Sequence, residues 1–207
     1  MSEIKNILLL FIILTLLLSC NNSNDKNCTP VSDPDNPCTP NSNSSDLLMT
    51  VIPQEVELWC WAACGEMVME KLGNAITQCD QANMRFGRTD CCESPTSDDC
   101  NRGGWPQFNM YEFKADSTLD AALSWEDVQH QIDCQKTPFC ATWKWDEGGG
   151  HMMVISAYKI EDGEKWVMLD DPYPVNAGLS SWIRHSEYVS GPGYSHWNDF
   201  FNIRKCR

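Results

Sequence analysis

The chain has 207 residues, of which 42% are apolar, and a formal net charge of -14 at pH 7. This excess of acidic groups argues against nucleic acids and anionic membrane surfaces as partners, because both would repel the protein. The length allows a leader, a linker and one ordinary domain with its own core.

Residues 1–20 are typical of a bacterial export signal. Lys5 precedes an apolar run over residues 7–18, which is shorter than the roughly 20 residues that a membrane span needs. A small residue and Cys20 follow, and this pattern resembles the lipobox of bacterial lipoproteins. The resemblance implies cleavage before Cys20, diacylation of its thiol and contact with the membrane through this lipid only. Asn21 then favours the outer membrane or the cell surface as the location within the bacterial envelope.

Residues 21–46 are rich in Asn, Ser, Asp and Pro. Such a composition cannot bury enough apolar surface to fold, so we expect a disordered tether here and a single domain over residues 47–207. Cys28 and Cys38 each begin a Cys-Thr-Pro triplet. The two could pair with each other, or each could form a bridge to the domain, and spacing does not decide between these alternatives.

The first half of the domain is predicted to be helical. Apolar residues at helical spacing indicate a helix over 60–72, which Gly73 ends. The polar stretch 78–102 holds four cysteines and is predicted to be loop-rich and stapled by disulfides. A second helix is expected over 124–133, with Ser124 as its cap.

The second half reads as strands over residues 139–145, 152–160 and 165–169. An Asp-Gly step at Asp162 separates the last two, which is a strong hairpin signal. Helices followed by an antiparallel sheet indicate an α+β domain.

Twelve cysteines in an exported chain favour disulfides over metal ligands. The sequence has no pair of Cys-x-x-Cys motifs of the kind that supply four zinc ligands, so we expect no zinc site. With Cys20 reserved for lipid and Cys60 for catalysis, an even number remains and full pairing is possible, although Cys64 could equally be a buried thiol. The ten remaining are Cys28, Cys38, Cys64, Cys79, Cys91, Cys92, Cys100, Cys134, Cys140 and Cys206.

Cys60 is the candidate nucleophile. It opens the predicted helix, where unpaired backbone N–H groups and the positive end of the helix dipole stabilise a thiolate. Its own N–H and the side-chain amide of Gln54, six residues upstream, could bind the oxyanion of an acyl-transfer reaction if the chain loops back. In a chain with so many cysteines, the competing interpretation of Cys60 is half of a disulfide.

His151 is the best candidate for the base. It follows three glycines, which leave room for substrate, and it opens an apolar strand. Among the other histidines, His130 lies in a predicted helix, while His185 and His196 lie in polar contexts, so we expect all three to be solvated.

Asp170 and Asp171 are the candidates for the residue that orients the imidazole. A two-residue hairpin turn would place Asp170 on the His151 face of the sheet, whereas a longer or bulged connection would place Asp171 there. Spacing alone leaves the choice open.

A helix that opens with Cys-Trp-Ala, preceded by Gln at this spacing, resembles the papain family. The Gly-Gly-Gly-His and Asp-Pro motifs further resemble its AvrRpt-type branch, named for effector proteases of plant pathogens. The resemblance favours Asp171 as the third catalytic member. It implies a papain-like fold in which the nucleophile helix packs on a C-terminal antiparallel sheet. It also implies endopeptidase activity without a cofactor, on protein or peptide substrates.

We expect a monomer. Trp61, Trp143 and Trp145 are candidates for the substrate groove, although sheet packing is the commoner role of paired strand aromatics such as Trp143 and Trp145. Two other functions stay open: a cell-wall peptide amidase or transglutaminase-like enzyme, and a catalytically inactive binding module stapled by disulfides.

Overall fold

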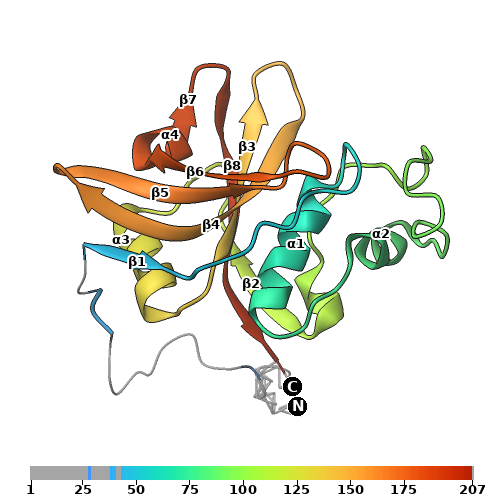
Figure 1. Ribbon diagram of the computed structural model, residues 1–207, viewed down its shortest axis with the longest axis horizontal. Coiled ribbons are helices and arrows are strands. Elements are labelled where there is room, and N and C mark those ends of the chain that lie inside the picture. The colour runs from blue at the N-terminus through green and yellow to red at the C-terminus, as the bar shows by residue number, and fades with distance from the viewer. Residues whose placement is uncertain (1–27, 29–37, 41–42, 207) are drawn as a thin grey trace, which may run out of the picture.

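The structure is a computed structural model that describes residues 28, 38–40 and 43–206 (Figure 1). The predicted signal at 1–20, Cys20 and most of the predicted tether lie outside the described residues. Within the described part, no helix combines the length and hydropathy needed to cross a bilayer.

Two helices form the first half of the domain. Helix α1, Cys60–Lys71, confirms the predicted helix. Helix α2, Gln78–Phe86, corrects the prediction of a loop-rich segment: the Thr77 side chain accepts a hydrogen bond from the first turn, and Gly87 ends the helix in a left-handed conformation. The sequence of α2 shows no apolar stripe, because its few buried positions include two glutamines.

The second half is dominated by one eight-stranded antiparallel sheet in the described part of the chain, with the order β2-β8-β3-β4-β5-β6. Strand β1 pairs with the end of β4, and β7 pairs with β8. The strands are β1 Ser44–Asp46, β2 Phe113–Ser117, β3 Phe139–Trp145, β4 Gly150–Glu161, β5 Glu164–Asp171, β6 Leu179–Arg184, β7 Ser190–Gly191 and β8 Tyr194–Lys205. Strands β3, β4 and β5 and the hairpin at Asp162 are confirmed.

Short helical segments connect the strands. The predicted second helix is divided, since α3, Trp125–Gln129, continues as a wider π-helical turn, η3, over His130–Cys134. Its predicted cap is confirmed, because Ser124 accepts a hydrogen bond from the backbone N–H of Asp127. The remaining segments are the 3-10 helix η2 Phe108–Tyr111 and α4 His185–Val189.

Strand β1 lies inside the range predicted to be a tether. Ser44, Ser45 and Asp46 pair with β4, and the carbonyl of Asn43 accepts a hydrogen bond from the N–H of Ile160. Folded structure therefore begins before residue 47. A strand so short and polar carries no apolar alternation, so its sequence gave no sign of pairing.

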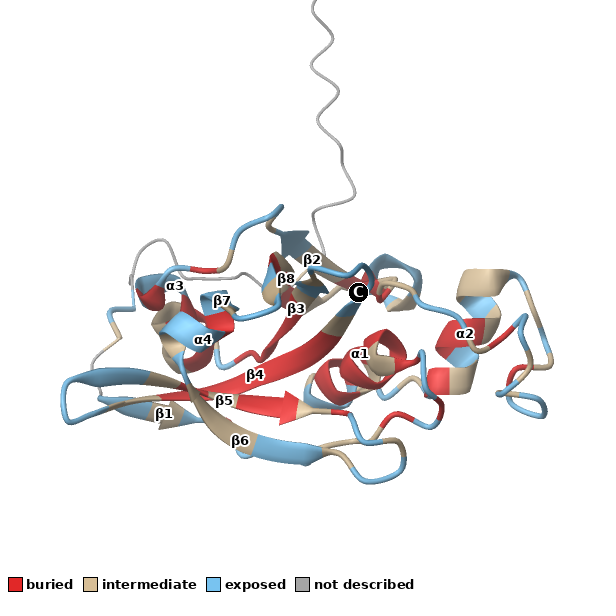
Figure 2. Ribbon diagram, turned by 90° about the horizontal axis from the view of Figure 1, so that it is seen from above, coloured by how far each residue is buried: buried red, intermediate tan, exposed pale blue. Residues whose placement is uncertain are grey.

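Both faces of the central strands are buried. On one face, Cys140, Met152 and Val154 pack with the buried residues of α1. On the other, Phe139, Met153 and Ile155 pack with Trp125 and Val128 of α3 and with Tyr188 of α4. Figure 2 shows β4 buried along most of its length, with α1 beside it. The predicted α+β arrangement, with the nucleophile helix on an antiparallel sheet, is confirmed.

Four disulfides staple the described residues: Cys28–Cys206, Cys38–Cys134, Cys79–Cys92 and Cys91–Cys100. Cys28 and Cys38 therefore bridge to the domain and do not pair with each other. Of the two alternatives for Cys64, the structure shows the buried thiol, and Cys140 is free as well, so the ten cysteines do not pair fully. Cys64 on α1 and Cys140 on β3 are completely buried in the same core cluster, where a thiol packs as a small apolar side chain.

Candidate active site

Cys60 is the first residue of α1, and its thiol is free and partly accessible. The N-cap residue is Trp59, whose side chain makes no capping hydrogen bond. Ala62 and Ala63 donate their N–H groups to the carbonyl of Trp59, so those of Cys60 and Trp61 are the ones that remain available to an anion. Donors of this kind can stabilise both a thiolate and the oxyanion that forms when it attacks a carbonyl.

The two ends of a β-hairpin place His151 and Asp171 together. His151 lies at the start of β4 and Asp171 ends β5, and His151 Nε2 is 2.6 Å from Asp171 Oδ1. The same oxygen accepts a hydrogen bond of 2.8 Å from the backbone N–H of Tyr173. Because Nε2 is held by the carboxylate, Nδ1 is the ring nitrogen left to face Cys60, whose thiol lines the same hollow as the imidazole and raises its pKa.

A β-bulge decides which aspartate faces the histidine. The hairpin turn has two residues, since Glu161 lies opposite Glu164, but the register shifts by one between Ile155 and Ala157. Beyond the shift, Asp170 lies opposite Val154 and shares its face, and Asp171 moves to the face of His151.

Asp170, our alternative third member, is placed elsewhere. It is buried, and its carboxylate accepts a hydrogen bond from the Ser180 hydroxyl. Burial raises the pKa of Asp170, while hydrogen bonds from Ser156 and Ser180 counter that rise. The structure therefore leaves Asp171 as the carboxylate that contacts His151.

The electrostatics around His151 favour its charged form. Burial lowers the pKa of the imidazole, but hydrogen bonds to Asp171 and Cys60, together with the charges of both groups, raise it further, to about 9. A protonated imidazole beside the thiol is the partner that a thiolate needs at neutral pH.

Gln54 is buried at the base of the loop that leads into α1. Its amide nitrogen donates hydrogen bonds to the carbonyls of Val56 and Glu57, at 2.9 and 2.7 Å. Its backbone is bonded to Pro172 and Asn176, which ties this loop to the segment after Asp171. Both amide N–H groups are thus engaged, and binding an oxyanion would require the release of one of them.

Two hollows meet at the imidazole. The first has a volume of about 280 Å³ and is lined by Cys60, Arg85, Gly103, Gly104, Trp105, Thr142, Gly149, Gly150, His151, Met152 and Trp197. The second, of about 350 Å³, is lined by Trp143, Trp145, Gly150, His151, Asp171 and Tyr173. Because both include His151, the site is an open cleft that continues on either side of the catalytic candidates.

The three tryptophans predicted for the groove differ in position. Trp143 and Trp145 line the second hollow, and their rings also pack against Tyr194. Trp61 is wholly buried under the first hollow, where its indole N–H donates to the carbonyl of Arg102. The prediction of Trp61 as a groove residue was therefore wrong: the second residue of α1 faces the core.

The remaining histidines are not simply solvated, as we expected. His196 is buried on β8, 3.0 Å from Asp199, which also binds the hydroxyl of Tyr188. His185 packs edge-on against Trp125, and burial lowers its pKa. His130 is partly buried and contacts Gln135. Burial of the His196–Asp199 pair excludes substrate, so these groups support the fold.

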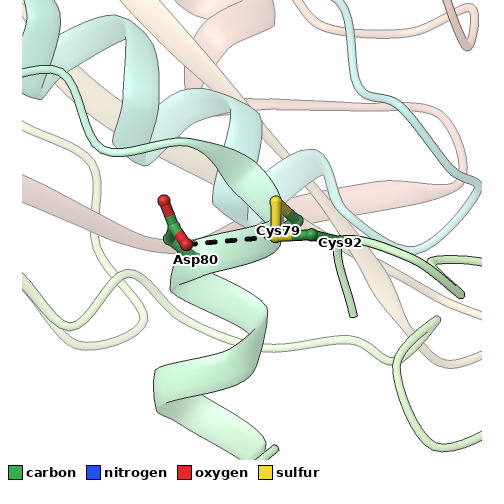
Figure 3. Close-up of side chains that lie close together, drawn as sticks. All are labelled: Cys79, Asp80 and Cys92. Atoms are coloured by element: carbon green, nitrogen blue, oxygen red, sulfur yellow. Dashed lines mark hydrogen bonds between the residues drawn. A yellow bond between two sulfur atoms is a disulfide. The ribbon is translucent and has the colours of Figure 1, made fainter. Parts of the chain in front are cut away.

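Acidic and sulfur-containing side chains gather at one exposed place on α2 (Figure 3). Asp80 Oδ1 lies 3.9 Å from Cys92 Sγ, and Cys92 is bonded to Cys79. Asp90 lies close to the Cys91–Cys100 disulfide in a similar way. A sulfur in a disulfide carries no thiolate charge for a metal ion, so neither group is a metal site while these bonds are formed.

Comparison with known proteins agrees with this geometry. The sequence profile of the Peptidase_C39 like family matches residues 47–197. Among solved structures, one from a study of the mite allergens Blo t 1 and Der p 1 covers 87% of this chain and 77% of its own, with 12% identity and a TM-score of 0.52. The match to the digestive procathepsin L 3 of Tenebrio molitor larval midgut covers 75% of this chain and 67% of the procathepsin chain, with 14% identity and a TM-score of 0.41. No curated protein gave a significant match.

Proposed function

The chain belongs to the Peptidase_C39-like family and is a cysteine peptidase of papain-like fold, and from this we propose that it is a thiol endopeptidase with Cys60 as nucleophile. The observation that carries this assignment is that Cys60 and His151 line the same hollow, while His151 Nε2 lies 2.6 Å from the Asp171 carboxylate. Cys60, His151 and Asp171 are the catalytic triad of the proposed enzyme.

Each residue has one role in the proposed reaction. The Cys60 thiolate attacks the peptide carbonyl, and the N–H groups at the start of α1 stabilise the oxyanion. His151 gives its proton to the leaving amine and then takes one from the water that hydrolyses the thioester. Asp171 holds the imidazole in the tautomer that presents Nδ1 to the sulfur. Gln54 becomes a second oxyanion donor if substrate displaces one of its loop carbonyls.

The shape of the cleft supports cleavage within a chain, as opposed to removal of terminal residues. Hollows lie on both sides of His151, so a substrate can extend in both directions from the scissile bond. The Gly-Gly-Gly-His and Asp-Pro motifs support an AvrRpt-type branch within the papain-like enzymes. Protein or peptide substrates suit both features.

The assignment is tested with purified protein on casein and on unfolded peptides. We expect Cys60→Ala to abolish hydrolysis, and Cys64→Ala, which removes a buried thiol one turn further along α1, to leave it intact. A peptidyl epoxysuccinate should label Cys60 alone. Labelling of another residue would refute the assignment, and hydrolysis of muropeptides without casein cleavage would favour a cell-wall amidase.

We also propose that the enzyme is exported and anchored by lipid at Cys20, on the strength of the apolar run over residues 7–18 and the Leu-Ser-Cys that follows. Cells fed labelled palmitate should incorporate it into the wild-type protein but not into Cys20→Ala. Wild-type protein that stays unlabelled, or label that persists in the variant, would contradict the anchor without affecting the proposed chemistry.

A further inference from the structure

Arg85 lines the first hollow without an acidic partner. It projects from the last turn of α2, and one of its terminal nitrogens donates a hydrogen bond of 3.1 Å to the backbone carbonyl of Trp105. Its Nε is buried and has no hydrogen-bond partner. Within the described part of the chain, no carboxylate forms an ion pair with Arg85, although Asp and Glu outnumber Lys and Arg by 29 to 15 in the sequence.

The surroundings of Arg85 add positive charge. Burial and the nearby charge of Arg102 lower the pKa of Arg85, and no acidic group offsets them. By contrast, Arg88, just beyond the same helix, forms ion pairs with Asp90 and Asp99. The guanidinium of Arg85 lies 5.5 Å over the ring of Trp61. An arginine that is held in this way and has no carboxylate partner is the kind of group that binds an anionic ligand.

The charge of the first hollow follows from its lining. Apart from Arg85, its ionisable groups are the Cys60 thiol and the His151 imidazole. When these two form a thiolate–imidazolium pair their charges cancel, which leaves Arg85 as the one uncompensated charge among the residues that line this hollow; the Asp171 carboxylate, bound to His151, lines the second hollow. None of the residues lining the hollow is acidic.

The wall around Arg85 is shaped for a side chain. Gly103 and Gly104 expose bare backbone, and a Cβ on Gly104 would collide with the side chains of Arg85 and Trp61. The indoles of Trp105 and Trp197 pack edge to face, 4.9 Å between centroids, and supply apolar surface in the same hollow. A substrate residue there would meet apolar walls along its stem and a guanidinium at its polar end.

Resting on the proposed endopeptidase function, we propose that this hollow selects an acidic residue of the substrate, whose carboxylate binds the guanidinium of Arg85. Arg85 is then a specificity-determining residue of the enzyme. Glutamate and aspartate are preferred over glutamine and asparagine, which have nearly the same shape but no charge. A charge-assisted hydrogen bond of this kind gives a preference of about 10- to 100-fold in kcat/KM.

The experiment compares matched peptides. Cleavage of a proteome-derived peptide library by the wild-type enzyme identifies the position, relative to the scissile bond, at which Asp and Glu are enriched. Synthetic peptides that differ only by Glu or Gln at that position then give the ratio of kcat/KM. We expect Arg85→Gln, which keeps a donor for the Trp105 carbonyl, to reduce this ratio to near one. Arg85→Lys keeps the charge and should retain part of the preference.

Arg88→Gln is the matched control, because it removes the same charge at an ion-paired site outside the hollow, and it should retain the full ratio. The labelling rate of Cys60 with a small neutral electrophile confirms that each variant is folded. Equal cleavage of Glu and Gln peptides by the wild-type enzyme, or a ratio that survives in Arg85→Gln, would overturn the proposed specificity alone. Failure to cleave any peptide would overturn the endopeptidase function and this inference with it.

Discussion

The role of Asp171 can be measured through the pH dependence of the Cys60–His151 pair. The pKa of His151 is raised from 6.5 to about 9, a difference that corresponds to about 3 kcal/mol in favour of the imidazolium. Because the raised value belongs to the folded state, this stabilisation is fully present below pH 6.5 and is lost as the pH rises through 9. The imidazolium should therefore persist at neutral pH, and peptide hydrolysis, which needs it to protonate the leaving amine, should decline only near pH 9.

Asp171→Asn removes the charge but keeps an oxygen near His151. The hydrogen bond to Asp171 is the largest of the effects that raise the pKa of His151. In Asp171→Asn we therefore expect the alkaline limb of the pH profile, where activity declines, to move down by about one pH unit or more. That shift is at least about 1.4 kcal/mol, or a tenfold change in the ratio of imidazolium to imidazole. The assay is kcat/KM for peptide hydrolysis between pH 5 and 10, because this reaction needs the His151 imidazolium as the acid.

Asp170→Asn is the control for this measurement. It changes a neighbouring buried carboxylate that binds Ser180 and lies on the other face of β5, so the alkaline limb should stay where it is. If the alkaline limb of the pH profile shifts in Asp170→Asn but not in Asp171→Asn, the assignment of Asp171 and the register argument behind it are refuted.

Three further variants test how the site is supported, by urea and thermal unfolding. Gly150→Ala should lower both Tm and activity, since the added Cβ would collide with a backbone carbonyl of β3 and with an indole of the cleft wall. Joint replacement of Cys91 and Cys100 by Ser should cost about 2–3 kcal/mol, because their disulfide closes a short loop beside the cleft. Tyr188→Phe should cost about 1–3 kcal/mol by removing a hydrogen bond from the buried Asp199.

The parts of the fold that the sequence predicted are those with strong local signals. Helix α1 has an apolar stripe and a terminating glycine, and the β4–β5 hairpin has an Asp-Gly turn. Helix α2 was missed because it is supported by a cap, a left-handed glycine and the Cys79–Cys92 disulfide, while its buried face is mostly polar. Pairing of Cys38 with Cys134 joins residues 96 positions apart, which no local pattern can indicate.

The choice between Asp170 and Asp171 shows where local reasoning ends. Two adjacent carboxylates at a strand end point to opposite faces, so a shift of one residue in register exchanges them. The turn has two residues, which on its own would have selected Asp170, and the shift arises next to Ser156, far from the turn. Neither the turn nor the strand composition reveals that bulge.

For the proposed oxyanion donor Gln54, the sequence likewise predicts the position of the residue but not the direction of its side chain. The spacing between Gln54 and Cys60 correctly brings the glutamine into the loop before α1, but it does not say which way the amide points. In the structure the amide binds the carbonyls of Val56 and Glu57, so it stabilises the loop that presents the thiol. The backbone N–H groups of α1 are therefore the donors already in place, and those of Gln54 become available only when a substrate competes with its own loop. A Gln54→Ala variant that lost stability as well as kcat would reflect both of these roles.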